Sequence, residues 1–418
     1  MPKSSFTMLA KATLATAGVL LLSCLAPAQT FTVLHNFTGG HDGAYPMAGL
    51  TVDRAGNLYG TAQFGGNTGV NCRSYYLGCG TVFELVHKSS GWLFTPIYSF
   101  RGGTDGTQPA ARVIFGPDGT LYGTTSQGGG YTCGYGGTCG TVFNLMPQVR
   151  ACKAALCTWN ETILHRFTGP PEDGQEPYSA DLVFDHSGNL YGTTVNGGPE
   201  GWGIVYKLTP SGGSWSESLL HYFNGGPPDC GQPVAGVVFD HLGDLYGTAA
   251  YGGSNDYGCV YELRQAGGAW QENVLYNFQG ASYGGGPVVG VVFDDVGNLY
   301  GAISFNPSLV YELSASGGYW SLNTIWSFSG QQGPMASLVL SGGNIYGTAV
   351  EYADGNGSVF ELTPGSAGQW SYRSLHDFSG WDGQYPYSNV TFDSQGNIYG
   401  TTSQGGLYGY GVVWEITP

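Results

Sequence analysis

The chain has 418 residues and a formal net charge of −16, although only 10% of its residues are charged. This mildly acidic, mostly neutral composition excludes proteins that bind nucleic acid or anionic lipid, because both ligands need clustered lysine and arginine. Glycine accounts for 73 residues, yet 14% of the chain is aromatic. Together with a regular spacing of motifs, this favours a folded repeat protein over a disordered chain.

Residues 1–28 fit a secretory signal peptide. They carry two lysines and no acid, then a mostly apolar run, then the small-residue cleavage site Ala26-Pro27-Ala28. We expect the mature chain to begin at Gln29, as a secreted or periplasmic protein. A less favoured alternative is lipid attachment at Cys24. Nothing else in the sequence approaches the roughly 20 apolar residues needed to span a bilayer.

One phrase is repeated seven times. "GNLYGT" at 56–61 returns as "GTLYGT", "GNLYGT", "GDLYGT", "GNLYGA", "GNIYGT" and "GNIYGT". The repeated tyrosines are Tyr59, Tyr122, Tyr191, Tyr246, Tyr300, Tyr346 and Tyr399. Their spacing is close to the period of propeller blades and longer than that of most helical solenoids.

Three further pieces accompany each tyrosine. An apolar run ending in Asp precedes it, as in "VVFD" at 237–240; "GTVFEL" at 80–85 and its relatives follow it; and a Trp-led run closes the unit, as in "WSESLLHYF" at 215–223. Such short Val- and aromatic-rich pieces bounded by Gly, Asp or Pro are typical of strands. The sequence therefore predicts an all-β domain over 29–418, a seven-bladed β-propeller with four antiparallel strands per blade and no helix of any length.

The two ends of the repeat complement each other. The segment 31–37, "FTVLHNF", is a fourth-strand piece without preceding partners, and the segment 412–418, "VVWEITP", stops at the third strand. We expect the N-terminal strand to complete the last blade, because this closure removes two open sheet edges.

The repeated phrase itself has a structural interpretation. In "D-x-x-G-N" the glycine suits a left-handed turn residue, and the Asp or Asn side chains suit bonds to the local backbone. The Leu and Tyr that follow point to opposite faces of the second strand, and the next glycine permits a close approach by a ring. The motif therefore predicts packing between blades rather than ligand binding.

The order "GxLYGTT..GG", "GxVFELTP", "LHxFxGGxDGxxP" resembles the GloVer tandem-repeat family of exported bacterial proteins, the "choice-of-anchor" group, over residues 31–418. The resemblance implies an exported or surface-displayed repeat protein and brings no established activity. Members of the group end in different anchoring tails. This sequence stops at Pro418, directly after a strand piece, so a C-terminal anchor is not expected.

Eight cysteines follow the signal segment, an even number that suits an oxidising compartment. Their positions in the repeat predict four structural disulfides, because paired cysteines occupy matching loops or the two sides of one hairpin. The expected pairs are Cys72 with Cys79, Cys133 with Cys139, Cys152 with Cys157, and Cys230 with Cys259. Free or metal-binding thiols are the less favoured alternative.

Catalytic motifs are sparse. "GASYG" at 280–284 matches the nucleophile-elbow pattern around Ser282, but that elbow needs a strand before it and a helix after it, so we interpret it as chance. Four histidines share the "LHxF" position of the outer strand, namely His35, His165, His221 and His376. A place repeated in the blade predicts packing rather than a metal ligand or general base.

The best candidate site is a loop of the form "GGHDGAYP" at 39–46, which precedes the innermost strand. Its acid recurs as Asp42, Asp105, Asp173, Asp229 and Asp382. Loops gather near the central channel at this point of a propeller, and loops on a rigid scaffold often carry function. These aspartates are either turn formers, which we favour, or ligands that bind calcium or the hydroxyls of a glycan.

Tyrosines in a neighbouring loop could stack on sugars or cover the disulfides. They are Tyr75 and Tyr76 in the first unit and Tyr131 and Tyr135 in the second. The sequence as a whole predicts an exported binding module for extracellular polysaccharide or an envelope protein, as a monomer, with no required cofactor and calcium as a possible ligand. The alternatives are a carbohydrate-active lyase or hydrolase at the channel mouth and a purely structural envelope protein.

Overall fold

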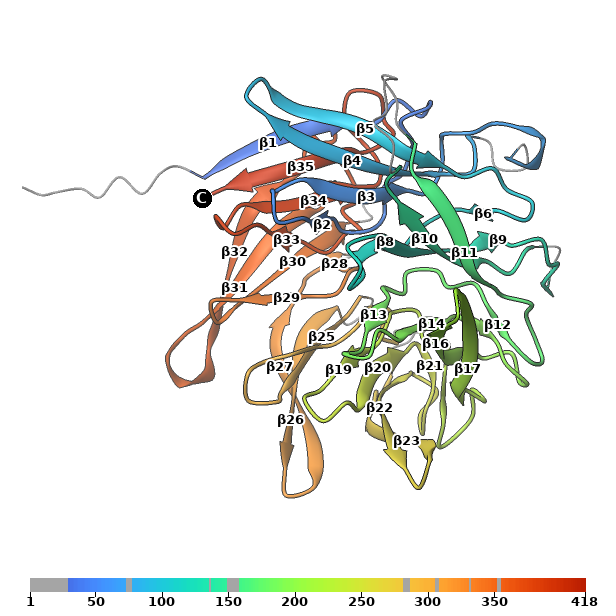
Figure 1. The fold of residues 1–418 in the computed structure, drawn as a ribbon. Coiled ribbons are helices and arrows are strands. Elements are labelled where there is room, and N and C mark those ends of the chain that lie inside the picture. The colour runs from blue at the N-terminus through green and yellow to red at the C-terminus, as the bar shows by residue number, and fades with distance from the viewer. Residues whose placement is uncertain are drawn as a thin grey trace, which may run out of the picture.

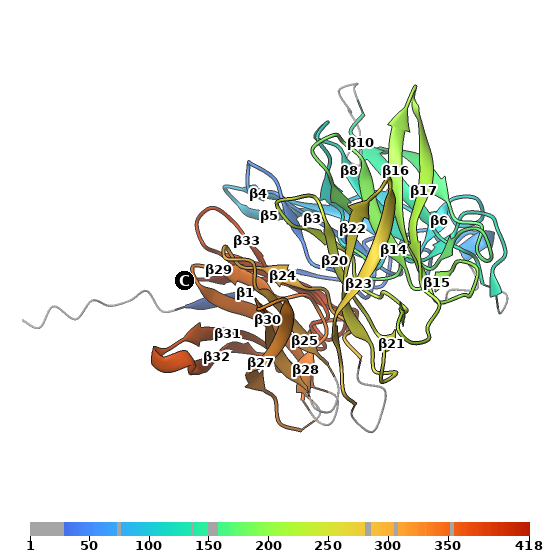
Figure 2. The ribbon, with the colours of Figure 1, turned by 90° about the horizontal axis from the view of Figure 1, so that it is seen from below.

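The computed structural model describes residues 29–72, 77–134, 137–148, 158–280, 286–304, 308–330, 332–351 and 355–418. The signal-peptide prediction, with Cys24, lies outside these residues. Seven antiparallel sheets of four or five strands, which are the blades, are arranged around a common axis (Figure 1). The sheet formed within residues 183–222 and the sheet formed within residues 332–377 lie on opposite sides of the molecule (Figure 2). The prediction of a seven-bladed β-propeller is confirmed.

Each blade runs from a short innermost strand to a long outermost strand. Blade 1 contains β2 (Thr51–Val52), β3 (Leu58–Ala62), β4 (Thr81–Lys88) and β5 (Gly91–Ser99), and blade 2 contains β7 (Ile114–Phe115), β8 (Leu121–Thr125), β10 (Thr141–Met146) and β11 (Asn160–Arg166). Blade 3 contains β13 (Val183–Phe184), β14 (Leu190–Thr194), β16 (Ile204–Ser211) and β17 (Ser214–Tyr222), and blade 4 contains β19 (Val238–Phe239), β20 (Leu245–Ala249), β22 (Cys259–Ala266) and β23 (Ala269–Asn277). Blade 5 contains β24 (Val292–Phe293), β25 (Leu299–Ile303), β26 (Leu309–Ser316) and β27 (Tyr319–Ser327).

Blades 6 and 7 vary this plan. Blade 6 contains β29 (Val339–Ser341), β30 (Asn344–Glu351), β31 (Ser358–Pro364) and β32 (Trp370–Asp377), and its β30 also pairs with β28 (Gln332–Pro334). Blade 7 contains β33 (Thr391–Phe392), β34 (Ile398–Thr402), β35 (Val412–Thr417) and β1 (Thr30–Asn36). Two-residue ladders pair β6 (Gly106–Thr107) with β9 (Gln127–Gly128), β12 (Gly174–Gln175) with β15 (Asn196–Gly197), and β18 (Cys230–Gly231) with β21 (Tyr251–Gly252).

The N-terminal strand closes the ring as predicted. β1 is the outermost strand of blade 7 and pairs with β35 in antiparallel register, from Thr30 opposite Thr417 to Asn36 opposite Val412. Figure 1 shows the two strands side by side, with the C-terminus at the end of β35. Phe37, directly after β1, is fully buried between blades 7 and 1.

The turn before each second strand has the predicted chemistry. In blade 1 the Asp53 carboxylate accepts hydrogen bonds at 2.8 Å from the backbone N–H groups of Ala55 and Asn57, and a third from the Asn57 side chain. Gly56 takes the left-handed conformation, with φ of 83°. The side-chain bonds satisfy the turn's own backbone donors.

The repeated Leu and Tyr pack into different neighbours. Leu58 lies in the cluster between blades 7 and 1, whereas Tyr59 lies in the cluster between blades 1 and 2, with its ring edge-on to Phe115 at 5.2 Å. The Tyr59 hydroxyl donates to Glu84 at 2.7 Å. A Cβ at Gly60 would meet the Phe83 ring at 2.5 Å. The interpretation of the repeated phrase as inter-blade packing is confirmed.

Strand is the dominant regular structure of the described residues, and the exceptions are two short 3₁₀ turns, Val70–Cys72 and Ser366–Gly368. No helix in this part of the chain is long and apolar enough to cross a membrane.

Candidate functional site: the loop face and the central cavity

We call the face formed by the crossover loops, which join the outermost strand of one blade to the innermost strand of the next, the loop face. The five predicted aspartates lie in these loops, where their carboxylates accept hydrogen bonds from the loop backbone. Asp42 accepts from Thr38 N–H at 2.9 Å, and Asp173 from Thr168 N–H at 2.8 Å. Asp105, Asp229 and Asp382 accept in the same way from Arg101, Asn224 and Ser379. All five therefore form turns.

The aspartates lie at the outer ends of their loops, beside the outermost strands. Four of them face the histidine of that strand, in the pairs His35–Asp42, His165–Asp173, His221–Asp229 and His376–Asp382. None belongs to the residues that line the central cavity. The expectation that the loops gather near the axis is met by their later residues and not by these carboxylates.

The same donors control the ionisation of these acids. Burial alone would raise the pKa of Asp42, but the hydrogen bonds from His35 and Thr38 outweigh it and hold the pKa below its usual value. Burial is outweighed in the same way at Asp173, Asp229 and Asp382. These carboxylates are therefore ionised and hydrogen-bonded at neutral pH.

A strained residue ends each of these five loops, just before the proline. It takes the left-handed conformation, with φ between 54° and 60°, although none is glycine; the residues are Tyr45, Gln108, Glu176, Gln232 and Tyr385. A residue before proline normally prefers extended backbone. The left-handed conformation is stabilised because both backbone groups of the residue make hydrogen bonds. Gln108 N–H donates to the carbonyl of Cys79 of blade 1, and the Gln108 carbonyl accepts from Ser126 N–H of blade 2. The loops thus join adjacent blades.

Every blade has a bulge at the same place in its outermost strand. In every blade the pairing between the third strand and the outermost strand shifts by one residue immediately before the histidine position. A bulge re-aims the side chain that follows it. His35 stacks on Phe94 of blade 1 at 3.7 Å, and His376 stacks on Phe31 of blade 7 at 3.6 Å. The other two "LHxF" histidines lie edge-on to the phenylalanine of their own motif, at 4.6 and 4.7 Å between ring centroids. The predicted packing is therefore confirmed at all four positions.

At three other interfaces between blades, a glutamate occupies the strand position of Phe94 and Phe31. Glu161, Glu217 and Glu272 each stand four residues before the histidine position of their own strand and face the previous blade. Burial and the nearby charge of Asp105 raise the pKa of Glu161 to about 8. Burial likewise raises the pKa of Glu217 to about 7 and, with Asp229, that of Glu272 to about 9. We did not predict these acids, although Glu in "NETILH", "SESLLH" and "QENVLY" was a visible repeat.

The propeller axis contains a cavity of about 640 Å³. One residue from each blade, directly after the loop proline, lies at the loop-face end of its wall: Met47, Ala110, Tyr178, Val234, Val288, Met335 and Tyr387. Most of the remaining lining is Val, Leu, Ala and Gly. The opening of the cavity is therefore apolar and partly aromatic.

Polar side chains form the next layer of the cavity wall. Arg112 of blade 2 and Asp181 of blade 3 make an ion pair at 3.0 Å, and each of the two side chains is about one-third exposed. Ser337 and Asn389 line the same wall. Sequence reasoning missed this pair. The available signal was a charge at the third position after the loop proline (the fourth in the longer blade 3 loop), where other units have Gly, Ser or Asn.

Of the four predicted tyrosines, Tyr131 is exposed, with 49% of its surface accessible. Tyr75, Tyr76 and Tyr135, like Ser282, lie outside the described residues. A second, polar hollow of about 410 Å³ borders the Tyr131 loop and is lined by Gln175, Glu176, Asn196 and neighbouring glycines. Among the described residues of the crossover loops, the most exposed aromatic residue is one we did not predict, Trp381, at 80%.

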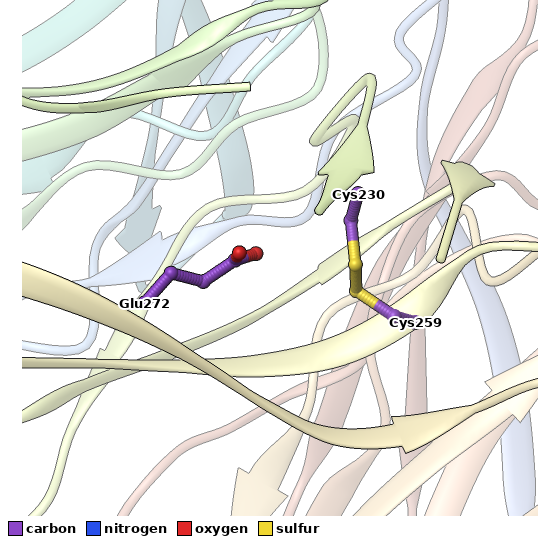
Figure 3. A group of neighbouring side chains, drawn as sticks. All are labelled: Cys230, Cys259 and Glu272. Atoms are coloured by element: carbon purple, nitrogen blue, oxygen red, sulfur yellow. A yellow bond between two sulfur atoms is a disulfide. The ribbon is translucent and has the colours of Figure 1, made fainter. Parts of the chain in front are cut away.

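Three of the four predicted disulfides are present, Cys72–Cys79, Cys133–Cys139 and Cys230–Cys259. Cys152 and Cys157 lie outside the described residues. Figure 3 shows the Glu272 carboxylate directed toward the Cys230–Cys259 bridge. Because its sulfurs are bonded to each other, this bridge supplies no thiolate to a metal ion. Three disulfides within one chain suit an oxidising compartment.

The family model for the Gloeobacter/Verrucomicrobia repeat matches residues 15–159, 136–308 and 302–418. The chain belongs to this repeat family. Members of the family share the unit that builds the blades, and the resemblance in the sequence is therefore confirmed. A search of curated proteins finds no match.

Solved structures share the fold at low identity. The extracellular domain of a proposed one-component system from B. thetaiotaomicron is 10% identical over 92% of this chain, with a TM-score of 0.54; this chain spans 39% of that one. An ulvan lyase of a polysaccharide lyase family is 10% identical, with a TM-score of 0.52 over 90% of this chain and 94% of that one. A periplasmic gluconolactonase from Pseudomonas aeruginosa is 17% identical, with coverages of 81% and 92% and a TM-score of 0.47. The first two similarities establish the propeller fold alone.

Proposed function

We propose that this repeat protein is an exported, monomeric binding module that takes a saccharide unit at the loop-face opening of its central cavity. The observation that supports the proposal is the composition of that opening. Its volume of about 640 Å³ lies within the range of roughly 300–1,000 Å³ of small-molecule sites. The disulfides support export to a periplasmic or extracellular compartment.

The chemistry of the wall suits a sugar. Tyr178 and Tyr387 provide rings that can cover the apolar C–H face of a pyranose, as aromatic side chains do in binding sites. Arg112 provides hydrogen-bond donors next to the acceptors of Asp181, and Asn389 adds an amide with both. Sugar hydroxyl groups could therefore both donate and accept hydrogen bonds at this wall. The carboxylates of Asp42 and Asp382, in contrast, already accept hydrogen bonds from the backbone of their own loops.

A glycan array with residues 29–418 tests this proposal, followed by calorimetry with the best ligand. The double variant Tyr178→Ala/Tyr387→Ala is expected to weaken binding by at least tenfold, because it removes both rings from the opening. Tyr319→Ala is the matched control, since Tyr319 is 81% exposed in the hairpin between β26 and β27. Equal losses in both variants, or no binding to any glycan, would refute the proposal.

Three further readouts separate the other hypotheses. Loss of binding in EDTA would favour calcium-assisted recognition by the crossover loops and lead to substitution of Asp42, Asp105 and Asp382. Release of shortened glycan products would favour a lyase or hydrolase. No binding on the array, together with capture of one envelope protein in a pull-down experiment, would favour a protein partner or a structural role.

A further inference from the structure

Two neighbouring inter-blade interfaces bring a histidine, an aspartate and a glutamate together from three separate segments. Between blades 2 and 3 they are His165 of β11, Asp173 of the crossover loop and Glu217 of β17. Between blades 3 and 4 the corresponding residues are His221 of β17, Asp229 and Glu272 of β23. In each group, one ligand atom per residue lies within 4.8 Å of the other two. We call them the His-Asp-Glu clusters.

The distances in the first cluster are close to those between ligands of one metal ion. His165 Nε2 lies 3.1 Å from Asp173 Oδ2 and 3.5 Å from Glu217 Oε2. A tetrahedral zinc ion with bonds of about 2.0–2.2 Å holds its ligand atoms roughly 3.3–3.6 Å apart. In the second cluster His221 Nε2 lies 3.3 Å from Asp229 Oδ1. In the neutral tautomer with its proton on Nδ1, the imidazole Nε2 and the two carboxylates are all electron-pair donors, so a cation can bind the three at once in place of the His–Asp hydrogen bond.

The glutamates have an unused oxygen in each cluster. Glu217 Oε1 and Glu272 Oε1 are buried and have no hydrogen-bonding partner among the described residues. An unpaired buried carboxylate oxygen is costly. The side chains of the first cluster stay partly accessible, with 19% exposure for His165, 7% for Asp173 and 16% for Glu217. Solvent, and hence an ion, can therefore reach the cluster.

The other interfaces show that the fold does not need this glutamate. His35 and His376 make the same pairing with a loop aspartate, and their rings are covered by Phe94 and Phe31 at the position of the glutamates. The loop aspartates there accept the same kind of backbone hydrogen bond as those of the two clusters. At the interface of blades 1 and 2, Glu161 is present but Tyr98 replaces the histidine, and its hydroxyl donates to Glu161 at 2.7 Å. Among the interfaces of the described residues, only the two clusters have both the strand histidine and the glutamate of the next blade.

We propose that each His-Asp-Glu cluster binds one divalent ion of the zinc type, which joins adjacent blades on the loop face. Three protein ligands and a water molecule would complete a tetrahedral site. An imidazole ligand favours zinc and similar transition metals over calcium and magnesium, which prefer oxygen ligands alone. This inference is independent of the saccharide proposal, because the clusters lie at the outer strands, away from the central cavity.

Metal content and melting temperature of residues 29–418 test the proposal. Protein stripped with EDTA is equilibrated with zinc chloride at neutral pH, dialysed, and analysed for bound metal. We expect two zinc ions per chain and a higher melting temperature than in the stripped protein. Glu217→Phe copies the residue of the other interfaces, so it should fold and bind one ion, and Glu217→Phe/Glu272→Phe should bind none. Glu217→Gln is a second variant that keeps the side-chain shape and should also bind one ion.

The matched control is Glu161→Gln, which alters the same strand position at an interface without histidine and should leave two ions bound. The proposal is overturned if the wild-type chain binds no zinc after dialysis, or if the double variant retains two ions through surface histidines. A stripped chain that binds no zinc but loses stability as Glu217 ionises would indicate that the clusters share a proton instead.

Discussion

Removal of residues 29–38 should destabilise the propeller severely, because β1 supplies the outermost strand of blade 7. The change removes fully buried Phe37, which packs against Phe83 at 5.3 Å between ring centroids. Loss of a buried phenylalanine side chain costs about 3–5 kcal/mol, and the partly buried Val33 and Leu34 add about 1 kcal/mol each. The backbone edge of β35 is also left unpaired. The sum is comparable to the roughly 5–15 kcal/mol by which domains are stable.

Thermal unfolding followed by calorimetry measures this loss in graded steps. With an unfolding entropy of about 2.1 cal/mol/K per residue, a mature chain of roughly 390 residues should lose about 4–6 °C in the variant Phe37→Ala. The deletion variant should lose more or fail to fold, and a synthetic peptide of residues 29–38 should restore its transition. Thr32→Ala, at an exposed position of β1, is the control. A deletion variant that melts like the full chain would refute the closure.

Three further predictions concern the interfaces. Glu161 keeps its proton up to about pH 8 in the folded state, compared with its usual value of 4.5, so unfolding between these values releases a proton and stability should fall as pH rises through this window. Glu161→Gln should flatten that part of the stability profile in denaturant titrations at pH 5, 7 and 9; an unchanged slope would contradict the assignment. Gly60→Ala should cost about 1–3 kcal/mol, because its Cβ would meet Phe83 at 2.5 Å, whereas Gly134→Ala meets nothing within 4 Å and should be neutral. Equal melting of both glycine variants would argue against the close packing. Replacement of Cys230 and Cys259 by alanine opens a loop with a sequence separation of 29 and should cost about 3.5 kcal/mol, against about 2 kcal/mol for Cys133 and Cys139 with a separation of 6. The reverse order in chemical denaturation would contradict the loop-entropy argument.

The sequence was sufficient for the fold because every blade repeats the same local chemistry. The Asp53 turn, the Leu58 and Tyr59 faces and the closing strand 31–37 follow from strand alternation and from turn residues that act within a few positions of each other. Equivalent cysteines in matching loops made Cys72–Cys79 and Cys133–Cys139 predictable in the same way.

Contacts between blades could not be predicted from one repeat unit. The direction of His165 depends on a bulge in its strand, and its partner Glu217 comes from the next blade, 52 positions later. The Arg112–Asp181 pair likewise joins two blades at the axis. The loop aspartates were recognised as turn formers, but their distance from the axis became apparent only once the crossover path was known.

The pairing of Thr30 with Thr417 places the two ends of the strand-forming chain next to each other. The ring of blades is therefore closed, and the packing of the blades does not depend on where in the ring the chain starts. A short linker between the ends, with new termini opened at the exposed hairpin of blade 5, where Gly317 and Gly318 meet no neighbouring atoms, should give a circularly permuted chain with the same seven blades. In such a chain β1 would be synthesised as an internal segment, so formation of blade 7 would no longer have to wait for the last residues to find the first.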